Sequence, residues 1–362
     1  MNTILISTSK FGTPIPNYFK FLGEEFRKNN FSIIFLFDGQ QKNMPPNKDN
    51  VKYFTYPSKR PTKLKDFIFL CKIMKKEKPI LAISNFGSTN IVTISSYIFR
   101  VPHRVNYIHT SPHQLYIDSK KSYIFDCFLK IRKIIILNMN THFITNSNKM
   151  SELISSFFKI KINNISILPY LLEESKKNRK NFSDRENKIC IVGRLELSKG
   201  HKELLRAFNE CKDKHPKLML LIIGDGPEKN NLQELTTDLG LNKHVIFSGN
   251  IPNKSINKIF SMCLASISAS RSEAFGIVNI ESLREGTPII CTNTEGAKDI
   301  IEHGKNGFHI NLMKKYDLSE RLTEIFNNWN YYSQNALKTF EKKYSKKNII
   351  YHYQRLENEL LK

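Results

Sequence analysis

The chain has 362 residues, of which 40% are hydrophobic and 11% aromatic, and its formal net charge is +23. This length exceeds a single compact core and predicts two domains, and the apolar content excludes a disordered chain. No stretch approaches the roughly 18 apolar residues of a membrane span, and the apolar start at Met1 lacks the features of a signal peptide, so we expect a cytoplasmic protein.

The positive charge is concentrated in the first half. Residues 1–170 contain 25 Lys and Arg against 9 Asp and Glu, which leaves +16 there and +7 in the rest of the chain. A field of this sign attracts phosphate-rich ligands, nucleic acid or an acidic membrane surface. The alternative interpretation is that the basic faces are merely solvated, and composition does not separate the two. The six cysteines have no metal-ligand spacing and predict buried free thiols rather than a metal site.

The first half alternates short apolar runs with helical patterns, which is typical of a parallel, doubly wound sheet. The predicted strands are Ile4–Ser7, Ser32–Phe37, Ile80–Ser84, Arg104–Ile108, Thr141–Thr145 and Ser166–Leu168. The predicted helices are Tyr18–Lys28, Lys63–Lys76, Asn90–Phe99, Ser122–Leu137 and Lys149–Phe157.

A polar segment separates this series from a second one. Residues 173–187 are almost wholly polar and predict a linker between domain 1–172 and domain 188–335. The strands of the second series are Ile189–Val192, Leu218–Ile223, Val245–Ser248, Leu264–Ser268, Pro288–Cys291 and Gly307–Ile310. The pattern is helical from Leu318 to the end. Ligands of such sheets bind beyond the carboxyl ends of the strands, so the loops there are the candidate sites.

The loop Gly193–Gly200 follows one such strand and opens a helix. It carries two cations, Arg194 and Lys199. Arg offers a planar fork, Lys a point charge, and a helix N-terminus adds its dipole, so together they suit a diphosphate. A surface loop with two solvated cations is the alternative interpretation.

The segment Glu273–Glu281 reads EAFGIVNIE and follows another strand. Its two carboxylates can accept hydrogen bonds from hydroxyls, and the small residues between them leave backbone amides free for a phosphate. This combination predicts a nucleotide-sugar site.

Three other loops are weaker candidates. Gly224 and Asp225 begin a glycine turn after a strand, and His109 ends a strand where it could bind a sugar hydroxyl. Gly12 lies between the first strand and the first helix, without the glycine pattern of a dinucleotide fold or of a P-loop. A plain turn or a structural histidine is the alternative for each.

Two helical segments of the first half, Lys63–Lys76 and Ser119–Leu137, combine apolar stripes with several lysines and arginines. Such helices can lie on an anionic bilayer. The alternative is a stripe that packs on the core and a solvated basic face.

The order of these motifs resembles the retaining glycosyltransferases of family 4. The matching motifs are Gly-Arg…Lys-Gly at 193–200, Gly-Asp-Gly-Pro at 224–227, the paired glutamates at 273 and 281, Gly-Thr-Pro-Ile-Ile at 286–290 and Asn-Gly-Phe at 306–308. The resemblance is specific over about 188–310 and looser over 1–170. It implies the GT-B architecture, an α/β fold with two doubly wound Rossmann-like domains that face a central cleft. It also implies that a C-terminal helix in 336–362 packs back on the N-terminal domain.

The resemblance implies roles for individual residues. Arg194 and Lys199 would hold the donor diphosphate, Glu273 a sugar hydroxyl and Glu281 the ribose hydroxyls. His109 matches a histidine near the transferred sugar. The other positions implied along the donor are Gly12, Gly193, Gly224, Asp225, Gly249, Ile251, Phe275, Gly276, Ile277 and Val278. The family's usual Gly-Gly near the first helix is reduced here to Gly12, so the role of that loop is open between donor phosphate and acceptor.

The implied function is transfer of a hexose or N-acetylhexosamine from a nucleotide sugar to a glycan or lipid-linked acceptor. A UDP-sugar is the expected donor, because uridine donors are the commonest among the relatives. The setting implied is bacterial surface polysaccharide or lipopolysaccharide synthesis, with peripheral contact of the basic domain with the inner face of the membrane. No cofactor, no metal and no nucleic-acid partner are expected. The alternatives left open are a catalytically inactive, transferase-like partner subunit and a nucleotide-sugar epimerase of the same fold.

Overall fold

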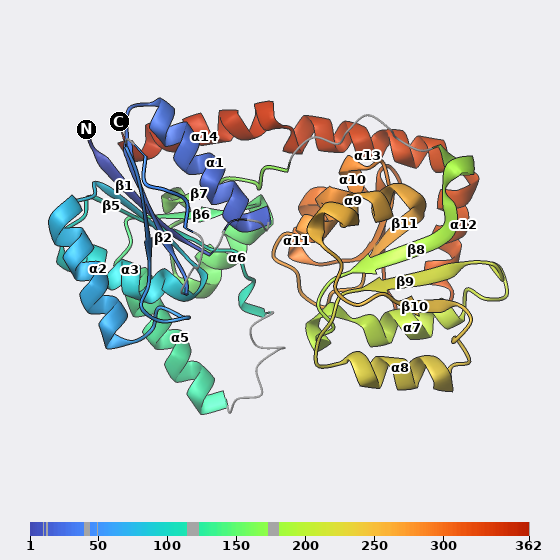
Figure 1. The fold of residues 1–362 in the computed structure, drawn as a ribbon. Coiled ribbons are helices and arrows are strands. Elements are labelled where there is room, and N and C mark those ends of the chain that lie inside the picture. Colours follow the sequence, from blue (N-terminus) through green and yellow to red (C-terminus); the bar gives the residue numbers. More distant parts are fainter. Residues whose placement is uncertain are drawn as a thin grey trace. The chain divides into compact units, whose positions relative to one another are not determined.

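The computed structural model describes residues 1–9, 11, 14–39, 44–48, 50–113, 123–172 and 181–361. The chain divides into two compact units (Figure 1). The first comprises Met1–His109, Lys121–Leu171 and Ile349–Lys362, and the second comprises Thr110–Lys120 and Leu172–Asn348. Each unit is built on its own parallel sheet.

The first unit has a seven-stranded parallel sheet of order β3-β2-β1-β4-β5-β6-β7. Its strands are β1 Thr3–Thr8, β2 Ser32–Phe37, β3 Val51–Thr55, β4 Leu81–Asn85, β5 His103–Tyr107, β6 His142–Thr145 and β7 Ile165–Ile167. Its helices are α1 Pro14–Lys28, α2 Leu64–Glu77, α3 Thr89–Ile98, α5 Tyr123–Leu137, α6 Asn148–Phe158 and α14 Lys346–Leu361. Leu5, Ile34 and Leu36 pack with α2 and α3 on one face of the sheet. α1 covers the other face, where Gly23 lies against the ring of Phe35.

The strand β3 was not predicted from the sequence. Its five residues are only partly buried, and it pairs with β2 alone at the edge of the sheet. An edge strand lacks the continuous apolar run that marks the central strands, so the pattern gave little signal. All the predicted strands are present.

The second unit has a six-stranded parallel sheet of order β10-β9-β8-β11-β12-β13. Its strands are β8 Glu186–Val192, β9 Met219–Ile223, β10 Val245–Phe247, β11 Cys263–Ser268, β12 Ile289–Thr292 and β13 Gly307–Ile310. Its helices are α7 His201–Asn209, α8 Lys229–Asp238, α9 Asn253–Met262, α10 Ile277–Arg284, α11 Glu295–Ile300, α12 Asp317–Asn327 and α13 Trp329–Tyr344. These observations confirm the predicted fold class of two Rossmann-like α/β sheets.

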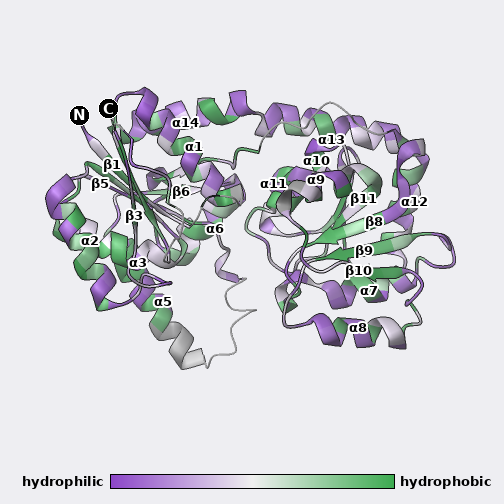
Figure 2. Cartoon of the chain, viewed as in Figure 1, coloured by the Kyte–Doolittle hydropathy of each residue, from purple (hydrophilic) through white to green (hydrophobic). Residues whose placement is uncertain are grey.

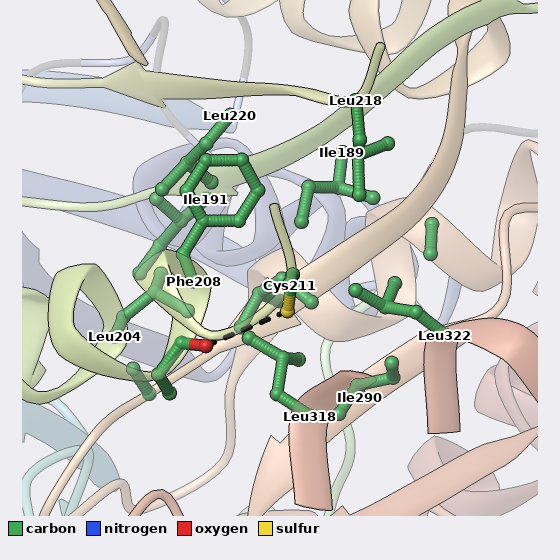
Figure 3. Packing of buried hydrophobic residues seen from close by; sticks show 14 of the residues in the cluster. Ile189, Ile191, Leu204, Phe208, Cys211, Leu218, Leu220, Ile290, Leu318 and Leu322 are labelled. Carbon is green, nitrogen blue, oxygen red and sulfur yellow. Dashed lines mark hydrogen bonds between the residues drawn. The ribbon is translucent and has the colours of Figure 1, made fainter. Parts of the chain in front are cut away.

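In the core of the second unit, alternate residues of β8 pack against helices on one face of the sheet. Figure 3 shows Ile189 and Ile191 of β8 against Leu204 and Phe208 of α7, with Leu318 of α12 nearby. Cys190, which points to the other face of β8, packs with Ile256 and Phe260 of α9. Hydropathy follows the same pattern, since the strands are mainly hydrophobic and the helices are mixed (Figure 2). This core holds the carboxyl ends of β8 and β11 in place, and those ends carry the candidate site.

The C-terminal segment consists of three helices rather than one. α13 contacts α10 and belongs to the second unit, whereas α14 belongs to the first unit from Ile349 onward. The rings of Phe26 and Tyr353 lie 5.2 Å apart, and Asn29 Nδ2 donates to Glu357 Oε1 at 2.8 Å. The C-terminal helix that was expected in residues 336–362 to pack on the first domain therefore begins, at residue 336, inside α13 of the second unit. β8 likewise begins at Glu186, inside the segment predicted as a linker.

None of the helices in the described ranges is long and apolar enough to cross a bilayer.

Candidate functional site

The loop after β8 is fixed by the loop after β9. Gly193 N donates to Ile223 O at 2.9 Å, and Leu195 N donates to Asp225 O at 3.1 Å. Gly224 has φ +136°, and a Cβ there would lie 1.9 Å from Gly193 O. Only glycine at position 224 allows this approach, so the loop after β9 supports the loop after β8.

The loop that opens α7 is fixed by the loop after β11. Arg271 N donates to Ser198 O at 2.8 Å. Gly200 precedes α7 with φ +66°, and a Cβ on it would lie 2.0 Å from Ala269 O. The close contact brings Lys199 and the first turn of α7 beside the end of β11.

The segment after β11 turns into α10 at Gly276, whose φ is +81°. Glu273 precedes this turn, and its backbone oxygen accepts from Gly296 N at 2.9 Å. α10 then starts at Ile277, so its free backbone N–H groups lie next to Glu273 in the chain.

These three segments enclose a cavity of about 370 Å³ in the second unit. It is lined by Ile191, Val192, Gly193, Arg194, Glu196, Lys199, His201, Ser268, Ala269, Ser270, Glu273, Gly276, Val278 and Asn279. Six of these were predicted as site residues: Gly193, Arg194, Lys199, Glu273, Gly276 and Val278. Glu196, His201, Ser270 and Asn279 were missed.

The other predicted residues of this unit do not line the cavity. Gly224 and Asp225 support the loops, since Gly224 N donates to Gly249 O at 2.9 Å and Asp225 Oδ1 accepts from Gly226 N at 2.8 Å. Ile251, like Val278, packs against the apolar cluster that contains Ile256 and Phe260. Ile277 is the first residue of α10.

Phe275 is buried and adjoins two other elements. Its ring meets that of Tyr344 edge-on at 6.1 Å. Its backbone oxygen lies 2.5 Å from where a Cβ on Gly296 would be. Phe275 therefore fixes the turn before α10 from outside the cavity.

Both cations of the cavity are paired with carboxylates. Lys199 Nζ lies 2.5 Å from Glu273 Oε2, and both side chains are less than one-fifth exposed. Arg194 Nη2 lies 2.9 Å from Glu196 Oε1 at the more exposed rim. The formal charges of these four side chains cancel. An entering diphosphate therefore competes with Glu273 and Glu196 for the cations.

Glu281 lies on α10, one turn beyond Val278, and is partly buried. Burial raises the pKa of its carboxyl to about 7, against an opposing effect of Arg284. A carboxyl with this pKa changes its charge near neutral pH.

His109 lies in the first unit, directly after β5. Its ring stacks on those of Phe86 and Tyr107 at centroid distances of 4.5 and 4.2 Å, and its Nδ1 contacts the hydroxyl of Tyr170. Burial lowers the pKa of His109 to about 3, so its imidazole is neutral at pH 7. Gly12, the other predicted site residue of this half, lies outside the described residues.

Within the described ranges, no group of three or more His, Cys, Asp or Glu side chains is arranged to hold a metal ion.

Comparison with known proteins shows similarity to glycosyl transferases. Residues 173–346 match the family described as glycosyl transferases group 1. Over 325 residues, the chain is 26% identical to an uncharacterized glycosyltransferase of Methanocaldococcus jannaschii, which covers 82% of this chain and 81% of that protein. The chain is therefore similar to glycosyl transferases over most of its length, and its residues 173–346 match the group 1 family.

Solved structures show the same fold over the whole chain. Sucrose-phosphate synthase from Thermosynechococcus elongatus superimposes with a TM-score of 0.80 at 16% identity, covering 99% of both chains. The Anabaena protein HepE in complex with UDP-glucose superimposes with a TM-score of 0.74 at 18% identity, also covering 99% of both chains. These likenesses establish the GT-B type of fold.

Proposed function

We propose that this protein is a group 1 glycosyl transferase that moves a hexose or N-acetylhexosamine from a UDP-sugar to a glycan or lipid-linked acceptor, with retention of anomeric configuration. The observation that carries the proposal is the cavity of about 370 Å³, where Arg194, Lys199, Glu273 and the start of α10 converge. Cations and free backbone N–H groups suit a diphosphate, and a carboxylate suits a sugar hydroxyl. The complex of HepE with UDP-glucose supports a UDP-sugar as donor.

The main catalytic task is stabilisation of the leaving diphosphate as negative charge builds on it. Lys199 is already held in the cavity by Glu273, and Arg194 is paired with Glu196 at its rim. Preorganised cations of this kind contribute to the rate because they need little rearrangement in the transition state. Their positive charge stabilises the leaving diphosphate, as a metal ion does in other transferases. We therefore propose a reaction that needs no metal. Activity in EDTA equal to that in Mg²⁺ tests this point.

Glu273 is proposed as a positioning residue rather than as a nucleophile. Its carboxylate is engaged by Lys199 and lies 3.5 Å from Ser270 Oγ. Lys199 pairs with Oε2 of Glu273, and a carboxylate accepts more than one hydrogen bond, so Glu273 can also accept one from a hydroxyl of the sugar. The acceptor then attacks from the face that the diphosphate leaves, and the leaving phosphate takes the acceptor's proton.

A panel of UDP-, GDP-, ADP- and TDP-sugars tests the donor assignment by thermal shift and saturation-transfer NMR. We expect selective binding of a UDP-sugar that is lost in Lys199→Ala and in Glu281→Ala. A folded protein that binds none of the panel would contradict the proposed function.

The pH dependence of donor affinity tests the proposed role of Glu281 on the ribose. The carboxylate accepts hydroxyl hydrogen bonds, and the pKa of about 7 means that it is mostly ionised at pH 8 and mostly protonated at pH 6. We therefore expect the affinity for UDP-glucose, measured by calorimetry, to fall by up to about tenfold from pH 8 to pH 6. Glu281→Gln should remove this dependence. The same slope in both proteins would exclude Glu281 as its source.

We also propose that the enzyme is cytoplasmic, rests on an anionic membrane through its first unit and acts in bacterial surface polysaccharide or lipopolysaccharide synthesis. Leu64 and Ile68 are 73% and 49% exposed on α2. Lys65 and Lys72 are exposed on the same helix. Exposed apolar side chains among cations suit the surface of an anionic bilayer.

Vesicle sedimentation tests this contact. We expect binding to phosphatidylglycerol vesicles that weakens with salt and is reduced several-fold in the double variant Leu64→Ser and Ile68→Ser, since these side chains would enter the interface. Met313→Ser, at an 80% exposed position of the second unit, is the matched control and should bind normally. Binding that is indifferent to salt and to lipid charge would refute the proposal.

A further inference from the structure

Asn279 is a buried polar residue in the wall of the cavity that the sequence did not single out. Its side chain is 2% exposed, and Nδ2 has no hydrogen-bond partner among the described residues. A Cβ on Gly276 would lie 2.7 Å from this Nδ2 and 3.5 Å from Glu273 Cγ. The amide of Asn279 therefore lies close to Glu273, and the missing side chain at Gly276 leaves room beside it.

His201 is the second such residue. It is the first residue of α7, is 2% exposed, and neither Nδ1 nor Nε2 has a partner in the described part of the chain. Burial, assisted by the charge of Lys199, lowers the pKa of His201 to about 4. The ring is therefore neutral at pH 7, with one donor nitrogen and one acceptor nitrogen.

Buried polar groups without partners are rare because each costs about 1–3 kcal/mol. Two in one cavity indicate that a ligand supplies the partners. The final side-chain torsion of Asn and His is soft, so each can turn its polar atoms toward the cavity. Loss of stability in the free protein is a common cost of a prepared binding site.

We propose that Asn279 and His201 bind the sugar of the donor through neutral hydrogen bonds. The inference rests on the proposed function and deepens it, because it assigns residues to the uncharged part of the donor. Asn279 lies beside Glu273, the residue proposed for a sugar hydroxyl. A hydroxyl can bond to either nitrogen of the His201 ring, since it donates to the acceptor nitrogen or accepts from the donor nitrogen, whereas a phosphate oxygen only accepts.

The test compares binding with stability in Asn279→Leu and His201→Leu. Leucine removes the polar atoms of each residue and keeps an apolar side chain of moderate size. We expect the affinity for UDP-glucose, measured by calorimetry, to fall about tenfold in each variant, which corresponds to one lost neutral hydrogen bond. The affinity for UDP should stay within about twofold. His201→Gln should retain part of the affinity because its amide can both donate and accept.

Thermal unfolding of the free variants distinguishes a binding role from a structural one. We expect the Tm of Asn279→Leu and His201→Leu to be unchanged or higher, since an unpaired polar group is removed. Asn231→Leu, the same change at an exposed position of α8, controls for the substitution.

Three results would overturn the proposal: a Tm lowered by several degrees in both variants, unchanged affinity for UDP-glucose, or an equal loss of affinity for UDP and UDP-glucose. The last would place the side chains on the diphosphate. If the unmodified protein binds neither compound, the donor assignment fails, and the Tm comparison alone decides whether the two side chains are unpaired.

Discussion

Replacement of Lys199 by alanine is expected to lower turnover by about 10²-fold or more. Removal of one preorganised group that stabilises developing negative charge typically has an effect of this size. Lys199 is 19% exposed and is held by Glu273 at 2.5 Å, so it is fixed before the diphosphate arrives. The measurement is release of nucleoside diphosphate from the donor under saturating conditions.

Lys202→Ala is the matched control. Lys202 lies on the first turn of α7 and is exposed, and its removal changes the net charge equally. It should retain nearly full activity. Because Lys199→Ala leaves Glu273 unpaired, thermal unfolding must show that the variant is folded. More than half of the normal turnover in folded Lys199→Ala would refute the proposed role.

Gly200→Ala is expected to be the most destabilising change at the site. A Cβ at Gly200 would lie 2.0 Å from Ala269 O, and the backbone φ of +66° is unfavourable for alanine. The clash forces α7 away from the end of β11. We expect a loss of about 3 kcal/mol or more in the free energy of unfolding by urea, together with loss of donor binding.

Gly240→Ala distinguishes the effect of the clash with Ala269 from the effect of the unfavourable backbone φ. Gly240 has φ +64°, but a Cβ there meets nothing within 4 Å. It should cost only the backbone strain of about 1–2 kcal/mol and leave donor binding intact. Equal destabilisation by both variants would show that the contact with Ala269 does not matter.

The fold was largely predictable because its central strands are buried on both faces. β2 and β4, for example, read as nearly continuous apolar runs between helical patterns. β3 was missed because an edge strand needs no such run. The division of the C-terminal helices was missed because the break near Ser345 has little local signal, whereas their contacts with α10 and with Phe26 of α1 arise only in the folded chain.

The site was predictable where chemistry follows a strand end in a recognisable order, as with Arg194, Lys199 and Glu273. The pairing of Lys199 with Glu273 was not, since it depends on how two loops approach across Gly200. The unpaired polar atoms of His201 and Asn279 were not predicted for a related reason. An unpaired polar atom is defined by burial and by missing partners, and neither can be read from residue types. Gly224 and Asp225 proved to support the loop beside the cavity instead of lining it.

The most direct test of the central claim is the fate of an isotopically labelled UDP-sugar incubated with the enzyme and a bacterial membrane fraction, followed by NMR. The account predicts release of UDP and label in a glycan or lipid-linked product that has the anomeric configuration of the donor, with both abolished in Lys199→Ala. Donor that is isomerised without transfer, or product of inverted configuration, would contradict it.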